Sequence, residues 1–160
     1  MYDNRGMDLT NESANINDKK REFLSIYIEN KREAEYMSER ILRLRSEAER
    51  MTASLKDAPG RSGFAPGQDR LQNCITEIMV QEHRYLKRLE TNLRLQGMLE
   101  EAIDSLPRPF QRQLLRMKFI DGAGWGEISD TMGYTSRHLQ RMLEQVIARM
   151  KLPSGWEELL

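Results

Sequence analysis

Four polar side chains near the C-terminus have the chemistry needed to recognise DNA bases: Ser136, Arg137, Gln140 and Arg141. An arginine guanidinium can bond both O6 and N7 of guanine, and a glutamine amide can bond N6 and N7 of adenine. Arg137 and Arg141 are four residues apart and would share one face of a helix. Whether the four act together therefore depends on the elements that present them.

The segment from Trp125 to Leu143 has the pattern of two short helices that cross at a tight turn. A small residue, Ser129, suits the close approach of the two backbones, and Gly133 can adopt positive φ in the turn. Apolar side chains that could lie on the facing sides of the two helices are Ile128, Met132, Tyr134, Leu139 and Met142. The expected N-caps are Gly124, with Glu127 at N3, and Thr135. The segment therefore predicts a helix-turn-helix.

The composition of the chain favours helices elsewhere too. The 160 residues include 19 leucines and only two valines, with long stretches rich in Glu, Arg, Lys, Met and Ala. These are straight-chain helix formers, whereas strands prefer β-branched residues. We expect an all-α protein.

A long helical segment is predicted over residues 19–56, with Asp18 as its N-cap. Apolar and small residues recur by alternating steps of four and three, as in a coiled-coil seam. They are Phe23, Tyr27, Asn30, Ala34, Met37, Ile41, Leu44, Ala48, Met51 and Leu55. Such a helix must pack against a partner.

The partner is predicted to be the next helix of the same chain. Residues 57–68 contain three glycines and two prolines and predict a loop, and Asp69 with Gln72 resembles a capping box. A second seam then follows Leu71, Ile75, Ile78, Glu82, Tyr85, Leu89, Asn92 and Gln96. Folded back, the two seams match at a constant index sum of 126, which pairs Asn30 with Gln96. Residues 19–96 therefore predict a long, coiled-coil-like antiparallel hairpin.

The remaining boundaries follow from composition. Residues 1–18 have no periodicity and predict a flexible tail. Gly97 is expected to interrupt the second helix, so that a separate domain covers 98–151 and a tail covers 152–160. Residues 107–151 carry eight Lys or Arg against four Asp or Glu, although the whole chain has 25 of each sign. The neutral chain thus contains a basic C-terminal third.

The C-terminal domain resembles region 4 of sigma-70-type transcription factors. The matching residues are Leu106-Pro107, Arg112, Leu115, Phe119, Gly122, Glu127-Ile128-Ser129 and Met132-Gly133-Tyr134-Thr135. The layout of the whole chain is similar to that of small phage-encoded transcriptional regulators of the ArpU/RinA type. Glycines at 124 and 126 depart from the sigma pattern, which often has a hydroxyl cap and an acidic residue there. The resemblance implies a DNA-binding transcription regulator whose second helix enters the major groove.

In such a fold one set of residues at the start of the second helix would contact bases, and another set would contact phosphates. The base-contacting set is Ser136, Arg137, Gln140 and Arg141, while Leu139, Met142 and Val146 pack inward. The phosphate-contacting set is Thr135, His138, Arg112, Arg116, Lys118 and Arg149. Phosphate contacts give affinity and position but carry no sequence information. Trp125 is expected in the core.

Several other classes of protein are disfavoured. Lone Cys74 cannot close a disulfide within the chain, and Cys74 with two histidines cannot form a structural zinc site. The sequence shows no hydrophobic run long enough for a membrane span and no secretory signal, so we expect a cytoplasmic protein. The resemblance to phage-encoded regulators implies that its cytoplasm is that of a bacterial host cell. No nucleophile, metal or phosphate-loop motif is present, and we expect neither an enzyme nor a cofactor.

Alternative functions stay open at this point. The sigma-like domain could serve an adaptor or inhibitor that binds RNA polymerase without reading bases. The chain could also be the DNA-recognition (small) subunit of a phage packaging terminase. In the leading hypothesis, the partners are double-stranded DNA, RNA polymerase and a second copy bound through the helical hairpin. A homodimer would place two helix-turn-helix units on spaced half-sites.

Overall fold

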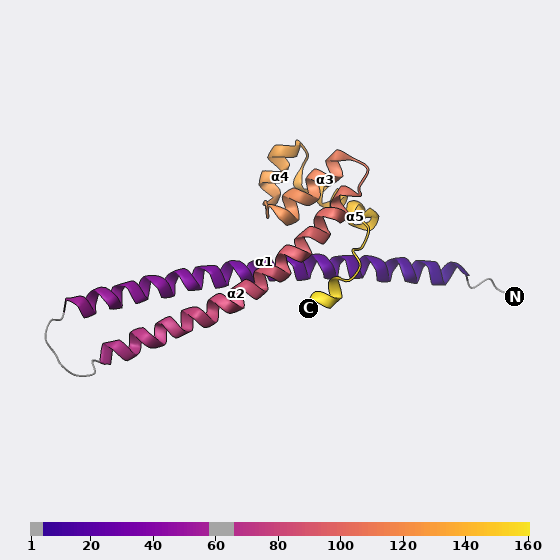
Figure 1. Ribbon diagram of the computed structural model, residues 1–160. Coiled ribbons are helices and arrows are strands. Elements are labelled where there is room, and N and C mark those ends of the chain that lie inside the picture. The colour runs from indigo at the N-terminus through magenta and orange to yellow at the C-terminus, as the bar shows by residue number, and fades with distance from the viewer. Residues whose placement is uncertain (1–4, 58–65) are drawn as a thin grey trace. The chain divides into compact units, whose positions relative to one another are not determined.

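The computed structural model describes residues 5–57 and 66–160, and every regular element in these ranges is helical (Figure 1). The predicted all-α class is therefore confirmed. The elements are α1 (Arg5–Lys56), α2 (Pro66–Asp104), α3 (Pro109–Leu115), a π-helical turn η1 (Arg116–Ile120), α4 (Trp125–Met132), α5 (Ser136–Arg149) and a 3₁₀ turn η2 (Trp156–Leu159). They form two compact units, one of residues 30–92 and one of residues up to Glu29 together with 93–160.

Helix α1 begins much earlier than the sequence indicated. It starts at Arg5, so Asp18 lies inside the helix and is not its N-cap, and most of the predicted tail 1–18 is helical. The buried side chains of Phe23, Leu24 and Tyr27 anchor this part of the helix. Extending an existing helix by one residue costs far less than starting a new one, so polar residues upstream can remain helical. Residues 1–4 lie outside the described ranges.

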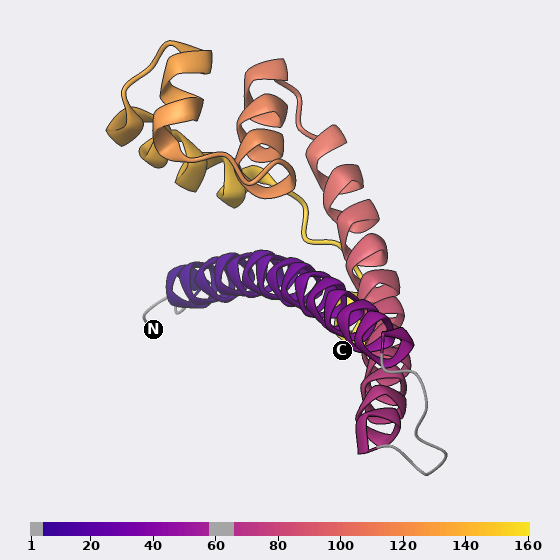
Figure 2. The same cartoon turned by 90° about the vertical axis from the view of Figure 1, so that its left-hand side faces the viewer.

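In the unit of residues 30–92, α1 and α2 lie side by side and run antiparallel (Figure 1), and Figure 2 shows the same pair turned by 90°. Ion pairs at 2.5 Å join Arg40 to Glu77 and Arg45 to Glu82. These long side chains can reach along the partner helix, so the two pairs do not define its direction. The direction follows from shorter groups: Leu44 lies beside Cys74, and Leu55 beside Gly67. Every seam residue predicted on α1 between 30 and 55 is buried or half-buried.

The register differs from the predicted index sum of 126. The Cys74 thiol donates to the Leu44 carbonyl oxygen at 3.5 Å, an index sum of 118, and the Leu55–Gly67 approach has a sum of 122. Cys74 is buried, as expected of a small hydrophobe, whereas Ile75 is 47% exposed. Cys74 and Ile75 are consecutive and both apolar, so the four-and-three spacing of the α2 seam is compatible with either residue. The seam follows Cys74, whose small side chain lets its sulfur reach the backbone of α1.

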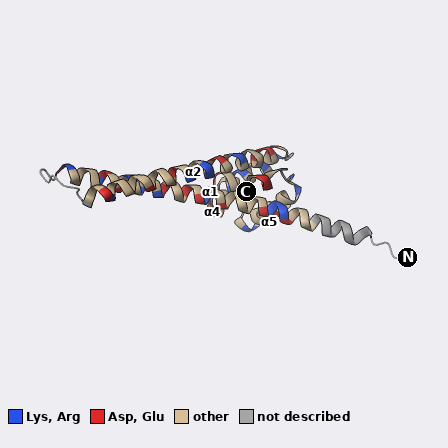
Figure 3. Cartoon of the chain, turned by 60° about the horizontal axis from the view of Figure 1, so that its bottom comes forward, with Lys and Arg blue, Asp and Glu red and all other residues tan. Residues whose placement is uncertain are grey.

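The polar pair predicted to fix the register also has other partners. Asn30 Oδ1 accepts a hydrogen bond from Arg88 Nη1 at 2.7 Å, and Gln96 Nε2 donates to Glu100 Oε1 at 2.9 Å. Arg88 also pairs with Glu33 at 2.8 Å. A charged side chain two turns from the expected partner thus satisfies the buried Asn30 oxygen. Charges of both signs are interspersed along this part of α1 and α2 (Figure 3).

Both predicted ends of the second helix are also corrected. Helix α2 begins at Pro66, so Asp69 lies in the first turn and is not the N-cap, and most of the predicted loop 57–68 falls in the undescribed range 58–65. At the other end the helix continues through Gly97 to Asp104. A glycine costs a helix about 1 kcal/mol. Burial of Leu95, Leu99 and Ile103 on one face outweighs that cost.

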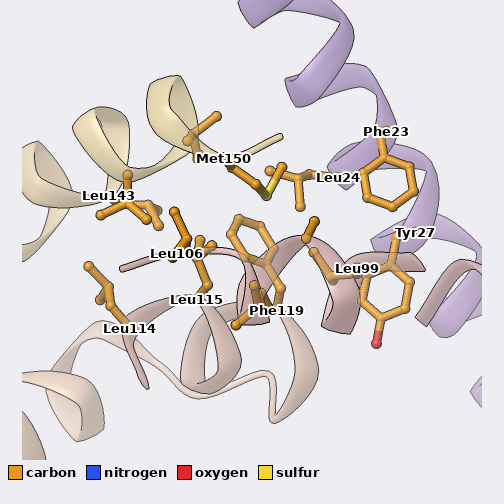
Figure 4. Close-up of a cluster of buried hydrophobic side chains, with 14 of the residues drawn as sticks. Phe23, Leu24, Tyr27, Leu99, Leu106, Leu114, Leu115, Phe119, Leu143 and Met150 are labelled. Atoms are coloured by element: carbon orange, nitrogen blue, oxygen red, sulfur yellow. The ribbon is translucent and has the colours of Figure 1, made fainter. Parts of the chain in front are cut away.

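The C-terminal unit is built around a dense core of side chains from every element in it (Figure 4). Phe23, Leu24 and Tyr27 of α1 meet Leu99 of α2, Leu115 of α3, Phe119 of η1, Leu143 of α5 and Met150. The predicted tail belongs to this core, because Trp156 is only 2% exposed and its ring meets the Phe23 ring edge-on at 5.7 Å. The first part of α1 and the last residues of the chain are thus components of one unit, which the predicted boundaries separated.

No helix in the part of the chain that the structure describes combines the length and the apolar character needed to cross a membrane.

Candidate nucleic-acid interface

Helices α4 and α5 meet at a corner whose residues have clear structural roles. Gly124 is the extended N-cap of α4, and Gly133 ends that helix with a φ of 73°, a left-handed conformation that glycine adopts without strain. The Ser129 hydroxyl donates to the Tyr134 carbonyl at 2.6 Å across the turn. Thr135 is the N-cap of α5, where Thr135 Oγ1 accepts from the His138 backbone N–H at 3.3 Å. The turn is therefore fixed from both sides.

Helix α5 is strongly two-sided. Leu139, Leu143, Val146 and Ile147 are buried on one face, and Met142 packs partly against the core. The opposite face exposes Arg137, Gln140 and Arg141. The inward residues predicted from spacing are therefore where they were expected.

The exposed face of α5 borders an open concavity. Its lining includes Arg137, Gln140 and Arg141, with Trp125 and Glu144 beside them. The side chains of Arg137 and Arg141 are both exposed. Two guanidinium groups and one amide are thus presented together to the surroundings.

Ser136, the fourth predicted base-contacting residue, is placed differently. Its side chain is half-buried, and its hydroxyl donates to the Trp125 carbonyl at 3.3 Å. The bond ties the first turn of α5 to the first turn of α4. Ser136 therefore helps to hold the corner, and its hydroxyl oxygen keeps lone pairs that can still accept from another donor.

Tyr134 is on the surface although its spacing indicated a core position. It is 46% exposed, and its ring stacks on His138 with ring centroids 5.4 Å apart. The rings of Phe110 and Tyr134 form a T-shaped pair, with centroids also 5.4 Å apart. The turn places Tyr134 outside the apolar face of both helices, because the chain reverses direction immediately before it. Three rings thus line up beside the N-terminus of α5.

The predicted phosphate-contacting cations around α3 and η1 have partners within the protein. Arg112 Nη1 donates to the Leu106 carbonyl at 2.6 Å, and Arg116 forms an ion pair with Asp104. The Lys118 ammonium lies over the Trp125 ring, 4.6 Å from its centroid. The first two hold α3 and η1 against the end of α2, whereas Lys118 lies next to the α5 concavity through Trp125. Arg149 and His138 are exposed on α5.

Trp125 has two roles in this arrangement. It is half-buried and packs against the core, as expected, but it also lines the concavity beside Arg137. As the first residue of α4, it joins the two helices of the corner through its carbonyl group.

The C-terminal end of α5 is held by α1. Lys20 is buried, and its ammonium group donates to the Ala148 carbonyl at 2.7 Å and to Asn17 Oδ1 at 3.4 Å. A cation at the last carbonyls of a helix is favourable because those groups have no partner within the helix and carry the negative end of its dipole. Burial lowers the pKa of Lys20 below its ordinary value. This contact joins the last turn of α5 to α1.

Sequence reasoning missed two charged residues of this surface. Glu144 lines the concavity and lies on the same stripe as Arg137, Gln140 and Arg141, so the helical spacing alone could have found it. Arg21 of α1 pairs with Glu144 at 2.7 Å. No local pattern identifies Arg21, because the contact joins residues from opposite ends of the chain.

Within residues 5–57 and 66–160, no three His, Cys, Asp or Glu side chains gather as a metal site requires.

No protein-family model, curated protein or solved structure matches the chain.

Proposed function

We propose that the protein is a sequence-specific DNA-binding transcription regulator of phage or prophage type, which reads the major groove with α5 as the second helix of a helix-turn-helix. The observation that carries this proposal is the exposed stripe of Arg137, Gln140 and Arg141 on a helix whose other face is buried. An α-helix fits the major groove of B-DNA, and these side chains can make bidentate contacts with guanine or adenine.

The corner geometry supports the same role. The N-terminus of α5 follows a short turn and is capped by Thr135, so the helix begins at a defined point. In helix-turn-helix proteins the first residues of the second helix approach the base edges. Arg137, Gln140 and Arg141 occupy the first two turns of α5 and are therefore at the end that would enter the groove.

Phosphate contacts are proposed for the groups that remain accessible near this face. Lys118, His138 and Arg149 fit that role, and Thr135 lies at the N-terminus of α5. Arg112 and Arg116 would contribute mainly by holding α3 and η1 in place. The partner is double-stranded DNA in the cytoplasm of a bacterial host, and a second copy joined through the paired α1 and α2 helices would let the protein bind two half-sites.

The test is a binding titration with a duplex that the parent protein has selected from a random pool. The parent should prefer this duplex to a scrambled one by about 10³-fold or more, and its affinity should fall steeply as salt rises. Replacing Arg137 or Arg141 by alanine should cost about 1–3 kcal/mol on the selected duplex and relax its specificity.

The matched control for these variants is Arg84→Ala. Arg84 is an exposed arginine on α2 in the other unit, so its loss changes net charge equally but removes no residue from α5. It should leave binding of the selected duplex unchanged. Equal affinity of the parent and both α5 variants would contradict base reading by α5.

A protein-binding adaptor is the second candidate, and one observation favours it. Ile75, Met79 and Leu86 are 47%, 66% and 60% exposed, at helical spacings that place them on one side of α2. An exposed apolar row of this kind suits a helical protein partner. Loss of RNA polymerase binding on Met79→Glu, with no preference for any duplex, would favour this role over DNA reading.

A further inference from the structure

The DNA-facing stripe of α5 includes an acidic side chain. Glu144 follows Arg137 by seven residues, Gln140 by four and Arg141 by three, and it lines the same concavity. Unpaired, its carboxylate would face the phosphates of a bound duplex and weaken binding through like-charge repulsion. If α5 binds DNA as proposed, the negative charge of Glu144 must therefore be compensated by a nearby cation.

Arg21 supplies the compensating charge from α1. Its Nη2 lies 2.7 Å from Glu144 Oε2, and both side chains remain more than half exposed. The hydrogen bond and the charge of Glu144 raise the pKa of Arg21, with a smaller contribution from Asp18. The pair thus lies at the surface, where a duplex could approach it.

Neighbouring contacts fix Arg21 in this position. Lys20, the preceding residue, donates to the Ala148 carbonyl on α5, and Phe23 is fully buried against Trp156. The backbone of α1 around Arg21 is consequently held against the C-terminal half of α5. A side chain on a fixed helix loses less conformational freedom when it forms an ion pair than one on a mobile segment.

We infer that Arg21 is a positioning residue of the DNA interface, which neutralises Glu144 and keeps its carboxylate turned from the phosphates. This role rests on the proposed function. DNA binding by α5 would then depend on Arg21 of α1, although Arg21 itself contacts no base. The effect is electrostatic, so it should shrink as salt rises.

The test is a double-mutant cycle on the selected duplex, with the full chain at low salt. Arg21→Ala should weaken binding by about two- to fivefold, the range expected for an exposed ion pair. Glu144→Gln should bind at least as tightly as the parent. Adding Arg21→Ala to Glu144→Gln should then have a much smaller effect, because the carboxylate on α5 is gone and only Asp18 of α1, 3.4 Å from Arg21, remains as its partner.

Two measurements separate this role from a structural one. Arg21→Lys should restore most of the affinity lost in Arg21→Ala, and all variants should keep the melting temperature of the parent. Lys19→Ala is the matched control. Lys19 is an exposed cation two residues before Arg21, but its partner is Glu157, 3.9 Å away, which is not on α5. It should bind like the parent.

The outcomes distinguish this inference from the proposed function. Equal losses on Arg21→Ala in both Glu144 backgrounds would mean that Arg21 contacts phosphate directly, and would overturn the inference. So would parent-like binding of Arg21→Ala while Arg137→Ala is weakened. If Arg137→Ala also binds like the parent, or no duplex is selected, the proposed function fails and the inference fails with it.

Discussion

The two compact units of the chain use helices in different ways. In residues 30–92, the buried side chains that the structure describes are Asn30, Ala34, Ile41, Cys74 and Asn92, which are mostly small or polar. The unit formed by residues up to Glu29 and 93–160 instead buries large apolar side chains, among them Trp156, Phe23 and Tyr27. One unit is a narrow seam between two helices, and the other has a three-dimensional core.

This difference indicates which unit supplies most of the stability. Burial of apolar area is the main favourable term in folding, so the C-terminal unit should supply most of the free energy of unfolding. The seam even contains a buried Asn92 Oδ1 with no hydrogen-bond partner among the described residues, which is unfavourable. The base reading proposed for α5 would need a rigid support, and α5 belongs to the unit with the larger core.

The largest expected effect tests the role of the C-terminal residues in that core. Trp156→Ala should lower the free energy of unfolding by about 3–5 kcal/mol, because it removes a large side chain that is 98% buried against Phe23. Denaturant unfolding followed by circular dichroism measures the change. A loss below about 1 kcal/mol would mean that the last residues are not part of the core.

Two isoleucines of α2 compare the units directly. Ile103 is fully buried in the C-terminal unit, whereas Ile75 is 47% exposed in the other. Ile103→Ala should destabilise the protein by about 2–5 kcal/mol, and Ile75→Ala by less than about 0.5 kcal/mol. Similar losses in both variants, measured by the same unfolding experiment, would contradict the difference between the units.

Two glycines should respond to alanine in opposite directions. Gly133 has a φ of 73°, so Gly133→Ala should cost about 1–2 kcal/mol and disturb the corner. Gly97 lies inside α2 with open space at its Cβ position, so Gly97→Ala should stabilise the protein by about 0.5–1 kcal/mol. Thermal unfolding gives both signs, and destabilisation by Gly97→Ala would show that α2 is interrupted there.

The smallest effect concerns the thiol in the seam. Burial, with a contribution from the charges of Glu47 and Glu77, raises the pKa of Cys74 above its ordinary value. The folded state therefore holds this proton more tightly, and its stability should decline slightly as pH rises through the unfolded pKa of about 8.5. Cys74 should react with iodoacetamide several-fold more slowly than the same thiol in urea. Equal rates would mean that the seam is open.

The sequence predicts the periodic features of this molecule well. The α1 seam, the N-caps Gly124 and Thr135 and the inward face of α5 all follow from local spacing, because each depends on residues within a few turns. The choice between Cys74 and Ile75 was beyond such reasoning. Adjacent apolar residues satisfy the same period, and only packing against α1 decides between them.

The features that sequence reasoning missed depend on distant contacts. Trp156 in a short polar tail carries no periodic signal, and its burial depends on Phe23 at the other end of the chain. Arg21 becomes part of the candidate site only because α1 lies against α5. Gly97 was predicted as a boundary because the low helix propensity of glycine can be recognised in the sequence. The burial of Leu95 and Leu99, which compensates for it, depends on the folded core.

The most direct test of the account is to repeat the selection from a random DNA pool with Arg137→Ala beside the parent protein. The parent should enrich one motif that includes a guanine, and Arg137→Ala should enrich a motif with the same remaining positions but no preference at that guanine. An identical motif from both proteins, or no motif from the parent, would contradict base reading by α5.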